Sequence, residues 1–434
     1  MRRKQLLRDR QALLDEIAAL QEENLRLLRG EPVEPPVPDS PEEEVAARPR
    51  DFSRFPLLRA VDEKYENTFP GGPRLVRPQP TLLQIAGHLR GYAAAHFGIH
   101  AGRPLFAHFL GAMAASDFLL LRGENPPLFC RAAAAAWGQE IEVIPARGDD
   151  SGSKGDILGE PGPAAGRYHE TGLLRAVYEA GYREGVSFAL LEDAAAMPER
   201  RLARLLPLLS LSHNNANFAR KIALAETAWP GDPALLEDGA LPWPGNLWVV
   251  GTLPAGAPPP SPQLRAPAME FCLPAAREAK LAALENPSPV GAAQLRGLFA
   301  HAREVYALPE ESLRHFALLE QYLAEHMELS LGAQALPQLR SFGGVSLACG
   351  LRPNEALDGF LYHRALRRLE TADPAALKYE LPGLRRFLAE TFGRRALPLS
   401  MEYLDRLEAP HNHPGPAGPP AGRVGYAEPL PGGE

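Results

Sequence analysis

Residues 246–254 read NLWVVGTLP and contain the short apolar run 247–251. A short, continuous apolar run of this kind predicts a strand that is buried on both faces of a sheet. Four similar runs occur at 118–121, 141–145, 186–191 and 268–273, separated by stretches with helical periodicity. The five runs therefore predict an α/β domain with a mainly parallel sheet covered by helices on both faces. We expect the run 118–121 to lie centrally, in the same sheet as 190–191 and 249–250.

The chain becomes helical throughout after about residue 286. Its clearest amphipathic segments are EESLRHFALLEQYLAEHMELSL at 310–331 and NEALDGFLYHRALRRLE at 354–370. We therefore assign 53–274 to an α/β domain with a helical lead-in, and 275–408 to an all-α lid domain. At 434 residues, the chain has room for both domains and for flexible ends.

The N-terminal segment carries a leucine heptad. Leu6, Leu13, Leu20 and Leu27 recur every seven residues, and Asn24 occupies an a position. Because a polar a residue fixes register, the pattern at 1–29 predicts a short coiled-coil helix that self-associates. The alternative is an amphipathic helix that packs on its own domain. The Pro- and Glu-rich residues 30–52 predict a solvated linker, and the Pro- and Gly-rich residues 409–434 predict a disordered tail.

Composition narrows the class of protein. A formal charge of −7 and a pI near 6.0 give no global positive field for a nucleic-acid backbone, so direct nucleic-acid binding is not expected. The three cysteines, Cys130, Cys272 and Cys349, lack metal-ligand spacing, so we expect neither a zinc site nor a disulfide framework. No apolar run reaches membrane-spanning length. These features are typical of a cytoplasmic protein with no membrane partner and no bound metal.

The order of these segments resembles the McrB-type branch of the AAA+ ATPases, over about residues 80–370. NLWVVGTLP is similar to that family's NLYIIGTMN strand, and LRAPAMEFCLP at 264–274 is similar to its DRAxVIEF strand. Residues 105–138 have the form of its helix, strand, phosphate-binding loop and helix. GDILGE at 155–160 and the lid segment 341–370 resemble two further parts. The resemblance implies an AAA+ P-loop-type parallel sheet followed by a helical lid.

The phosphate-binding loop is degenerate by this resemblance. An active loop, GxxxxGK[ST], surrounds phosphates with backbone N–H groups and supplies a lysine and a magnesium-binding hydroxyl. Here the run starts at Gly123, and Leu128, Phe129 and Cys130 replace the second glycine, the lysine and the hydroxyl. Pro126 and Pro127 remove two N–H donors from the same run. Arg122, Arg131 and Lys154 are the nearest alternative cations.

The family's catalytic and sensor positions are altered as well. The family ends a buried strand with Asp and then Glu, and here Glu192 and Asp193 occupy those places in reversed order. They form either an altered metal site or a polar strand end that caps the next helix, and we favour the second interpretation. Pro254 replaces the sensor asparagine, and Gln334 aligns with the sensing arginine of the lid. Arg265 matches the arginine presented to a neighbouring subunit. It is either such a trans-acting residue or an ion-pairing surface arginine.

Three functions remain open from the sequence. The first is a catalytically inactive, AAA+-like scaffold without a cofactor, assembled through its zipper and paired with an active AAA+ paralogue. The second is a divergent active ATPase or GTPase that uses Mg²⁺ with Glu192, Asp193 and Arg265. The third is an unrelated enzyme that uses polar residues such as His213, Asn214 and Asn215, although no GxSxG or HExxH signature is present. We favour the first.

Overall fold

The computed structural model describes residues 53–66, 79–146, 155–162, 167–210, 220–254, 256–273, 290–393 and 395–412. The predicted coiled-coil helix at 1–29 and the linker at 30–52 lie outside the described residues, as do His213, Asn214, Asn215 and Lys154. Within the described part, no helix is long and apolar enough to cross a membrane.

The five predicted apolar runs form one fully parallel sheet. The strands are β1 (Phe118–Arg122), β2 (Glu142–Ile144), β5 (Ser187–Leu191), β8 (Leu247–Leu253) and β9 (Met269–Cys272). Their order is β2-β5-β8-β1-β9. The predicted parallel sheet and the five runs that form it are confirmed. The middle strand is β8, whereas β1, which we expected to lie centrally, lies between β8 and the edge strand β9. Two short antiparallel pairs stand apart from it: β3 (Glu160–Pro161) with β4 (Tyr168–His169), and β6 (Lys221–Ala223) with β7 (Ala240–Pro242).

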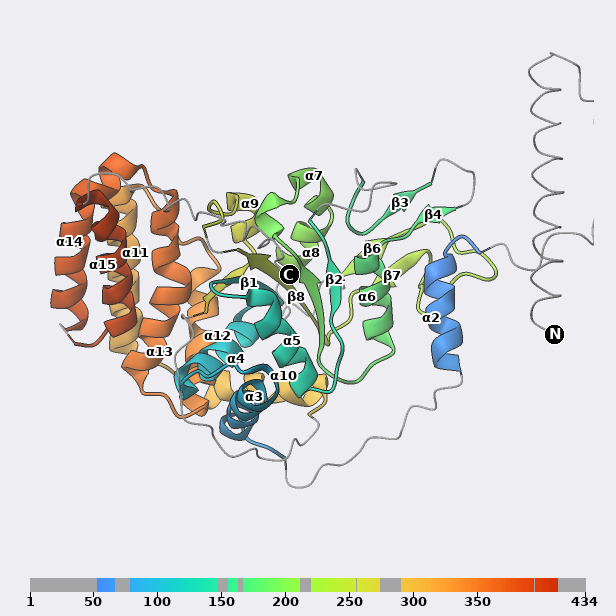
Figure 1. Ribbon diagram of the computed structural model, residues 1–434, viewed down its shortest axis with the longest axis horizontal. Helices are drawn as coiled ribbons and strands as arrows, with labels where there is room; N and C mark the ends of the chain where they lie inside the picture. Colours follow the sequence, from blue (N-terminus) through green and yellow to red (C-terminus); the bar gives the residue numbers. More distant parts are fainter. Residues whose placement is uncertain are drawn as a thin grey trace, which may run out of the picture. The chain divides into compact units, whose positions relative to one another are not determined.

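Helices surround this sheet and continue beyond it (Figure 1). Before and between the strands lie α2 (Pro56–Glu66), α3 (Leu82–Phe97), α4 (Arg103–Ala115), α5 (Pro126–Ala136), α6 (Gly172–Gly181), η1 (Ala194–Ala196), α7 (Glu199–Leu202), α8 (Leu205–Ser210) and α9 (Pro262–Arg265). After the last strand come α10 (Ala292–Val305), α11 (Glu310–Met327), α12 (Ala335–Ala348), α13 (Pro353–Phe360), η2 (Leu361–Ala365), η3 (Leu366–Thr371), α14 (Pro374–Phe392) and α15 (Pro398–Asn412).

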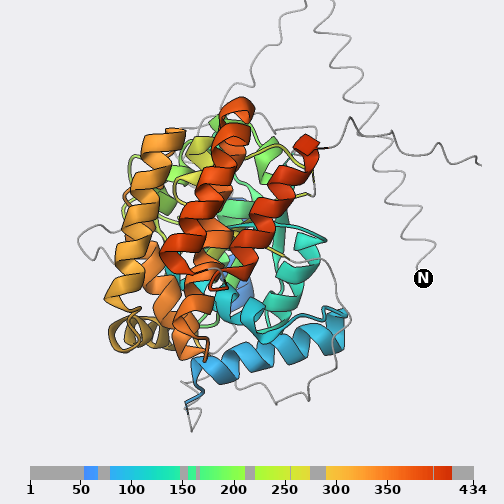
Figure 2. The same ribbon diagram turned by 90° about the vertical axis from the view of Figure 1, so that its left-hand side faces the viewer.

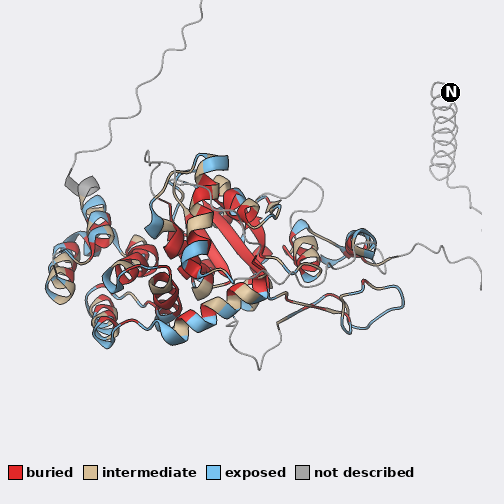
Figure 3. Ribbon diagram, turned by 90° about the horizontal axis from the view of Figure 1, so that it is seen from below, coloured by how far each residue is buried: buried red, intermediate tan, exposed pale blue. Residues whose placement is uncertain are grey.

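Both faces of the sheet are buried, because successive side chains of a strand point to opposite faces. Leu119 and Leu121 of β1 belong to the apolar core formed with α3, α4 and α5, and this core continues into the C-terminal helices. Phe118 and Leu120 of β1 belong to a second core, formed with α2, α6 and η1 to α8. The strands accordingly form the buried centre of Figure 3. The fold is therefore α/β with helices on both faces of a parallel sheet, followed by a helical region, as predicted.

The quoted stretch 246–254 supplies the central strand and two of its polar anchors. The Asn246 amide donates to the carbonyls of Ala180, Arg183 and Gly185, at 2.7 to 3.0 Å, and so joins the start of β8 to the turn after α6. The indole of Trp248, which is fully buried, donates to the Met113 carbonyl at the end of α4. Because both buried polar groups have partners, the central strand carries no unpaired donor at these positions.

The C-terminal region contains helices only, and α11, α14 and α15 run side by side (Figure 2). Asp373 caps the N-terminus of α14 by accepting from the Ala375 and Ala376 N–H groups, and Pro374 follows at the first helical position, where no N–H is needed. The last helix, α15, ends at Asn412. The predicted tail boundary at 409 is therefore four residues too early, and 413–434 lie outside the described residues.

Candidate functional site

The turn after β1 is where a P-loop would lie, and here it is short. Gly123, Glu124 and Asn125 alone separate β1 from α5. Gly123 has a φ of +130°, and a Cβ at this position would lie 2.5 Å from the Leu273 carbonyl oxygen. Asn125 adopts the left-handed conformation with a φ of 48°. The surviving glycine is thus explained by close packing of the turn against the end of β9.

The N-terminus of α5 has no N–H group left for a phosphate in its first turn. Pro126 and Pro127 have no N–H. The Leu128 N–H donates to Asn125 Oδ1 at 3.3 Å, and the Phe129 N–H donates to the Asn125 carbonyl at 3.4 Å. Anion binding at a helix N-terminus depends on these first-turn donors, and here each of them is either absent or already bonded.

The side chains that replace the lysine and the hydroxyl point into the core. The Phe129 ring is 3% exposed and lies 5.0 Å from the Phe109 ring and 6.1 Å from the Phe271 ring, measured between centroids. Cys130 is buried, and burial raises the pKa of its thiol well above the usual range. Leu128 is half-buried. No cation and no ionised or hydroxyl ligand is therefore directed from these three positions toward a phosphate.

The two alternative cations that the structure describes, Arg122 and Arg131, do not restore the loop. Arg122 turns toward the C-terminal region, where its Nη2 forms a 3.2 Å ion pair with Glu370. Arg131 is exposed on α5, one turn into the helix. The residues of this turn therefore do not fit a nucleoside triphosphate.

The acidic pair lies at the same edge of the sheet, since parallel strands end together. Glu192 is exposed and Asp193 is half-buried directly after β5. The Asp193 N–H donates to the hydroxyl of Thr252 in β8 at 3.0 Å, and Asp193 has a φ of 49°. Its side chain makes no cap to the following helix η1. Our expectation of a capping carboxylate is therefore wrong, because backbone conformation and Thr252 form this turn instead.

The two sensor positions are separated by the fold. Pro254 follows β8 directly and is exposed, at the carboxyl edge near Gly123 and Glu192. Gln334 precedes α12 and lines a hollow with Ser116 and Asp117, which lie at the opposite, amino end of β1. The structure thus places Gly123, Glu192, Asp193 and Pro254 at one edge, but not Gln334. Among the described residues, no group of three or more His, Cys, Asp or Glu is placed to hold a metal ion.

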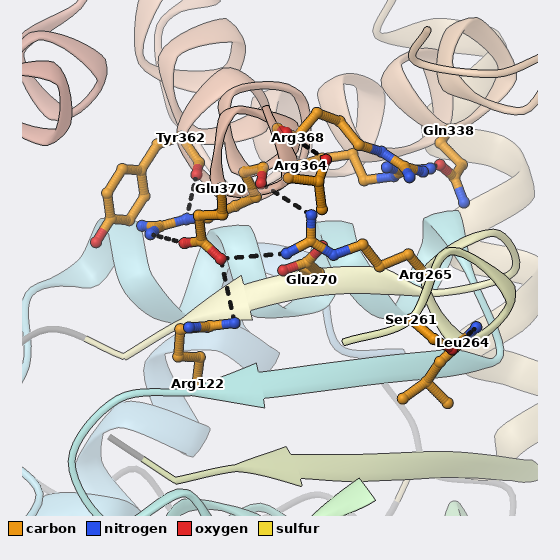
Figure 4. A network of polar contacts seen from close by, with 12 residues as sticks. Arg122, Ser261, Leu264, Arg265, Glu270, Gln338, Tyr362, Arg364, Arg368 and Glu370 are labelled. Carbon is orange, nitrogen blue, oxygen red and sulfur yellow. Dashed lines mark hydrogen bonds and ion pairs between the residues drawn. The ribbon is translucent and has the colours of Figure 1, made fainter. Parts of the chain in front are cut away.

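Arg265 is fully buried, so it is not the surface arginine that we expected as one alternative. Its Nε pairs with Glu270 and its Nη2 pairs with Glu370, both at 3.1 Å, and its Nη1 donates to the Arg367 carbonyl at 3.0 Å. Figure 4 shows this arrangement along β9. The guanidinium joins the sheet to the C-terminal helices within one chain and is not presented to a neighbouring subunit.

Glu370 is the centre of this polar network. Its carboxylate accepts from or pairs with Arg122, Arg265 and Arg367 at 3.1 to 3.2 Å, and the Tyr403 hydroxyl donates to it at 3.3 Å. Sequence reasoning missed this cluster. A signal was available, because 364–368 place three arginines inside an otherwise apolar helical stretch, and such arginines are rarely buried unless they are paired.

A second contact joins the helices to the edge strand. The Cys272 N–H donates to Nδ1 of His363, which lies in the π-helical segment η2 and stacks on the Phe271 ring with centroids 4.4 Å apart. Burial lowers the pKa of His363 well below its usual value. The neutral imidazole thus accepts the hydrogen bond that a carbonyl of a neighbouring strand would otherwise accept, and it covers the free edge of β9.

The sequence matches no protein-family model, and no curated protein matches it. Among solved structures, the chain is similar to a candidate ATPase from Cytophaga hutchinsonii, with a TM-score of 0.41 and 10% identity, over 72% of this chain and 87% of that one. It is also similar to NtrX from Brucella abortus, with a TM-score of 0.24 and 12% identity, over 82% of this chain and 72% of that one.

Proposed function

We propose that this chain is a degenerate, non-catalytic relative of McrB-type AAA+ ATPases that keeps the fold for assembly rather than for nucleotide hydrolysis. One observation carries the proposal: the first turn of α5 has lost its phosphate donors. Two prolines remove N–H groups, and Asn125 binds the next two. Without free donors in this first turn, the loop lacks the helix N-terminal groups that hold a phosphate chain in an active P-loop.

The chemistry of the neighbouring positions supports the same conclusion. Phe129 lies in the aromatic core where a phosphate-binding lysine would be needed, and Cys130 is buried where Mg²⁺ would need an oxygen ligand. Losing one preorganised donor to a transition state typically costs about 3 to 4 kcal/mol. Several such groups are missing together, so Glu192 and Asp193 alone have no bound phosphate and metal on which to act.

The intramolecular role of Arg265 also favours a non-catalytic protein. An arginine that stabilises a neighbour's transferring phosphoryl group must reach across a subunit boundary. Arg265 is instead fully buried between Glu270 and Glu370 of its own chain.

Equilibrium titration with Mg·ATP and with Mg·GTP tests the proposal. We expect no binding at millimolar nucleotide and no phosphate release above a blank. The matched variants are Glu192→Gln and Asp193→Asn. Magnesium-dependent turnover in the unchanged protein that either substitution abolishes would establish the divergent active ATPase instead.

The assembly role rests on the leucine heptads at 1–29 and on the loss of phosphate donors from the first turn of α5. We propose that the chain self-associates through this segment and that its protein partner is an active AAA+ paralogue. Deleting 1–29 should lower the mass measured by light scattering. An unchanged mass would remove the self-association part of the proposal and leave the nucleotide part standing.

A further inference from the structure

An excess of positive charge is buried between β9 and the C-terminal helices. Five arginines, Arg122, Arg265, Arg364, Arg367 and Arg368, act on two glutamates, Glu270 and Glu370. Three of the arginines form ion pairs with these carboxylates. Arg122, Arg265 and Arg367 all pair with Glu370, and Arg265 also pairs with Glu270. The cluster therefore holds three positive charges more than its carboxylates balance.

Arg364 and Arg368 carry two of these three charges. Arg364 is 2% exposed, and its Nε donates to Gln338 Oε1 at 3.2 Å. Within the described residues, Arg364 Nη1 and Arg368 Nε are buried atoms without a hydrogen-bond partner. Burial, followed by repulsion from Arg368, lowers the pKa of Arg364 to about 10. A buried guanidinium with an unmet donor is costly, and a bound anion would remove that cost.

We propose that Arg364 Nη1 and Arg368 Nε form a binding site for an oxyanion of the phosphate class, separate from the degenerate P-loop. Guanidinium groups match the oxygens of phosphates and carboxylates in geometry. The excess charge favours a phosphate group, which carries about −1.5 to −2 at pH 7, over a single carboxylate.

Gln338 connects Arg364 to a hollow of the surface. It lines a hollow of about 410 Å³, and its Oε1 accepts from Arg364 Nε. In Figure 4, Arg364 and Arg368 extend from the C-terminal helices, with Gln338 next to them. Arg368 is half-buried, so the cluster reaches the surface there as well. The Gln338 amide has N–H groups that can donate to a bound oxyanion.

The rival explanation is internal. Glu270 Oε2 is also buried without a hydrogen-bond partner, and Glu270 acts electrostatically on both Arg364 and Arg368. If the Glu270 carboxylate alone satisfies the two arginines in solution, no anion is required. The two explanations make opposite predictions about added phosphate, so titration distinguishes them.

The test is calorimetric titration of the full chain with inorganic phosphate at constant ionic strength, with sulfate and acetate in parallel. We expect phosphate and sulfate to bind, acetate to bind more weakly, and Arg364→Met and Arg368→Met each to weaken phosphate binding by about tenfold or more. Arg352→Met is the matched control, because Arg352 is exposed and pairs with Glu355, which is not a member of the cluster. It should bind phosphate as the unchanged protein does.

Thermal unfolding gives a second readout. In chloride, Arg364→Met should unfold no earlier than the unchanged protein, since it removes an unbalanced charge. In phosphate, the unchanged protein should gain stability and the variant should not. The proposal is overturned if phosphate neither binds nor stabilises, if acetate binds equally well, or if Arg368→Met, at its half-buried position, retains full phosphate affinity. ATP binding that is lost in Arg368→Met but kept in Glu192→Gln would place the nucleotide phosphates here and not at the P-loop.

Discussion

Replacing Glu370 with glutamine should destabilise the protein strongly, although the side chain keeps its shape. The carboxylate lies 3.1 to 3.2 Å from nitrogen atoms of Arg122, Arg265 and Arg367, and its side chain is 14% exposed. Removing one partner of a buried ion pair typically costs about 3 to 5 kcal/mol, because the other charge stays buried. Glutamine retains one acceptor oxygen, so we expect a loss near the lower end, about 3 kcal/mol.

Denaturant unfolding followed by circular dichroism measures this loss as a lower midpoint at an unchanged slope. The control is Glu355→Gln, because Glu355 pairs at 2.9 Å with Arg352, whose side chain is 82% exposed. An exposed pair contributes about 0 to 1 kcal/mol, so this midpoint should hardly move. Equal shifts for the two variants would refute the argument that Glu370 holds the helices on the sheet. Hydrogen exchange should also quicken at Cys272 in Glu370→Gln, since the β9 edge is covered by the same helices.

Phe129→Ala should cost about 3 to 5 kcal/mol of unfolding free energy, because it opens a cavity among the core aromatic rings, and denaturant titration will measure it. The triple variant Leu128→Gly, Phe129→Lys, Cys130→Thr should gain no Mg·ATP affinity by calorimetry, since Pro126 and Pro127 still lack N–H groups; tight binding would contradict our account of α5. The free energy of unfolding should fall as the pH falls from about 6.5 to 4. Burial lowers the pKa of His108 to about 4, so in this range the unfolded chain binds a proton at His108 and the folded chain does not. His108 alone accounts for roughly 3 kcal/mol of this loss, so His108→Gln should flatten the pH profile of the unfolding midpoint.

The strands were predictable because their signal is local. A run such as 247–251 is apolar at every position and shorter than an ordinary helix, which is the pattern of a strand buried on both faces. All five runs form the parallel sheet. The loss of P-loop chemistry could also be predicted in part. Pro126 and Pro127 have no backbone N–H and Phe129 has no charge, whatever conformation the turn adopts. That Asn125 binds the remaining first-turn donors depends on its left-handed backbone, which the sequence did not indicate.

The sequence by itself determined the class of the fold, the order of its sheet and lid segments, and the residue types missing from the phosphate-binding turn. The tertiary structure alone decided which charges meet. Glu370 lies more than 100 residues from Arg265 and more than 240 from Arg122, so no local pattern could pair them. Nor could a local pattern show that β8 lies at the centre of the sheet or that His363 lies at the edge of β9. Strand order and edge contacts are fixed by packing between distant segments, whereas hydrophobic periodicity reports burial along one segment at a time.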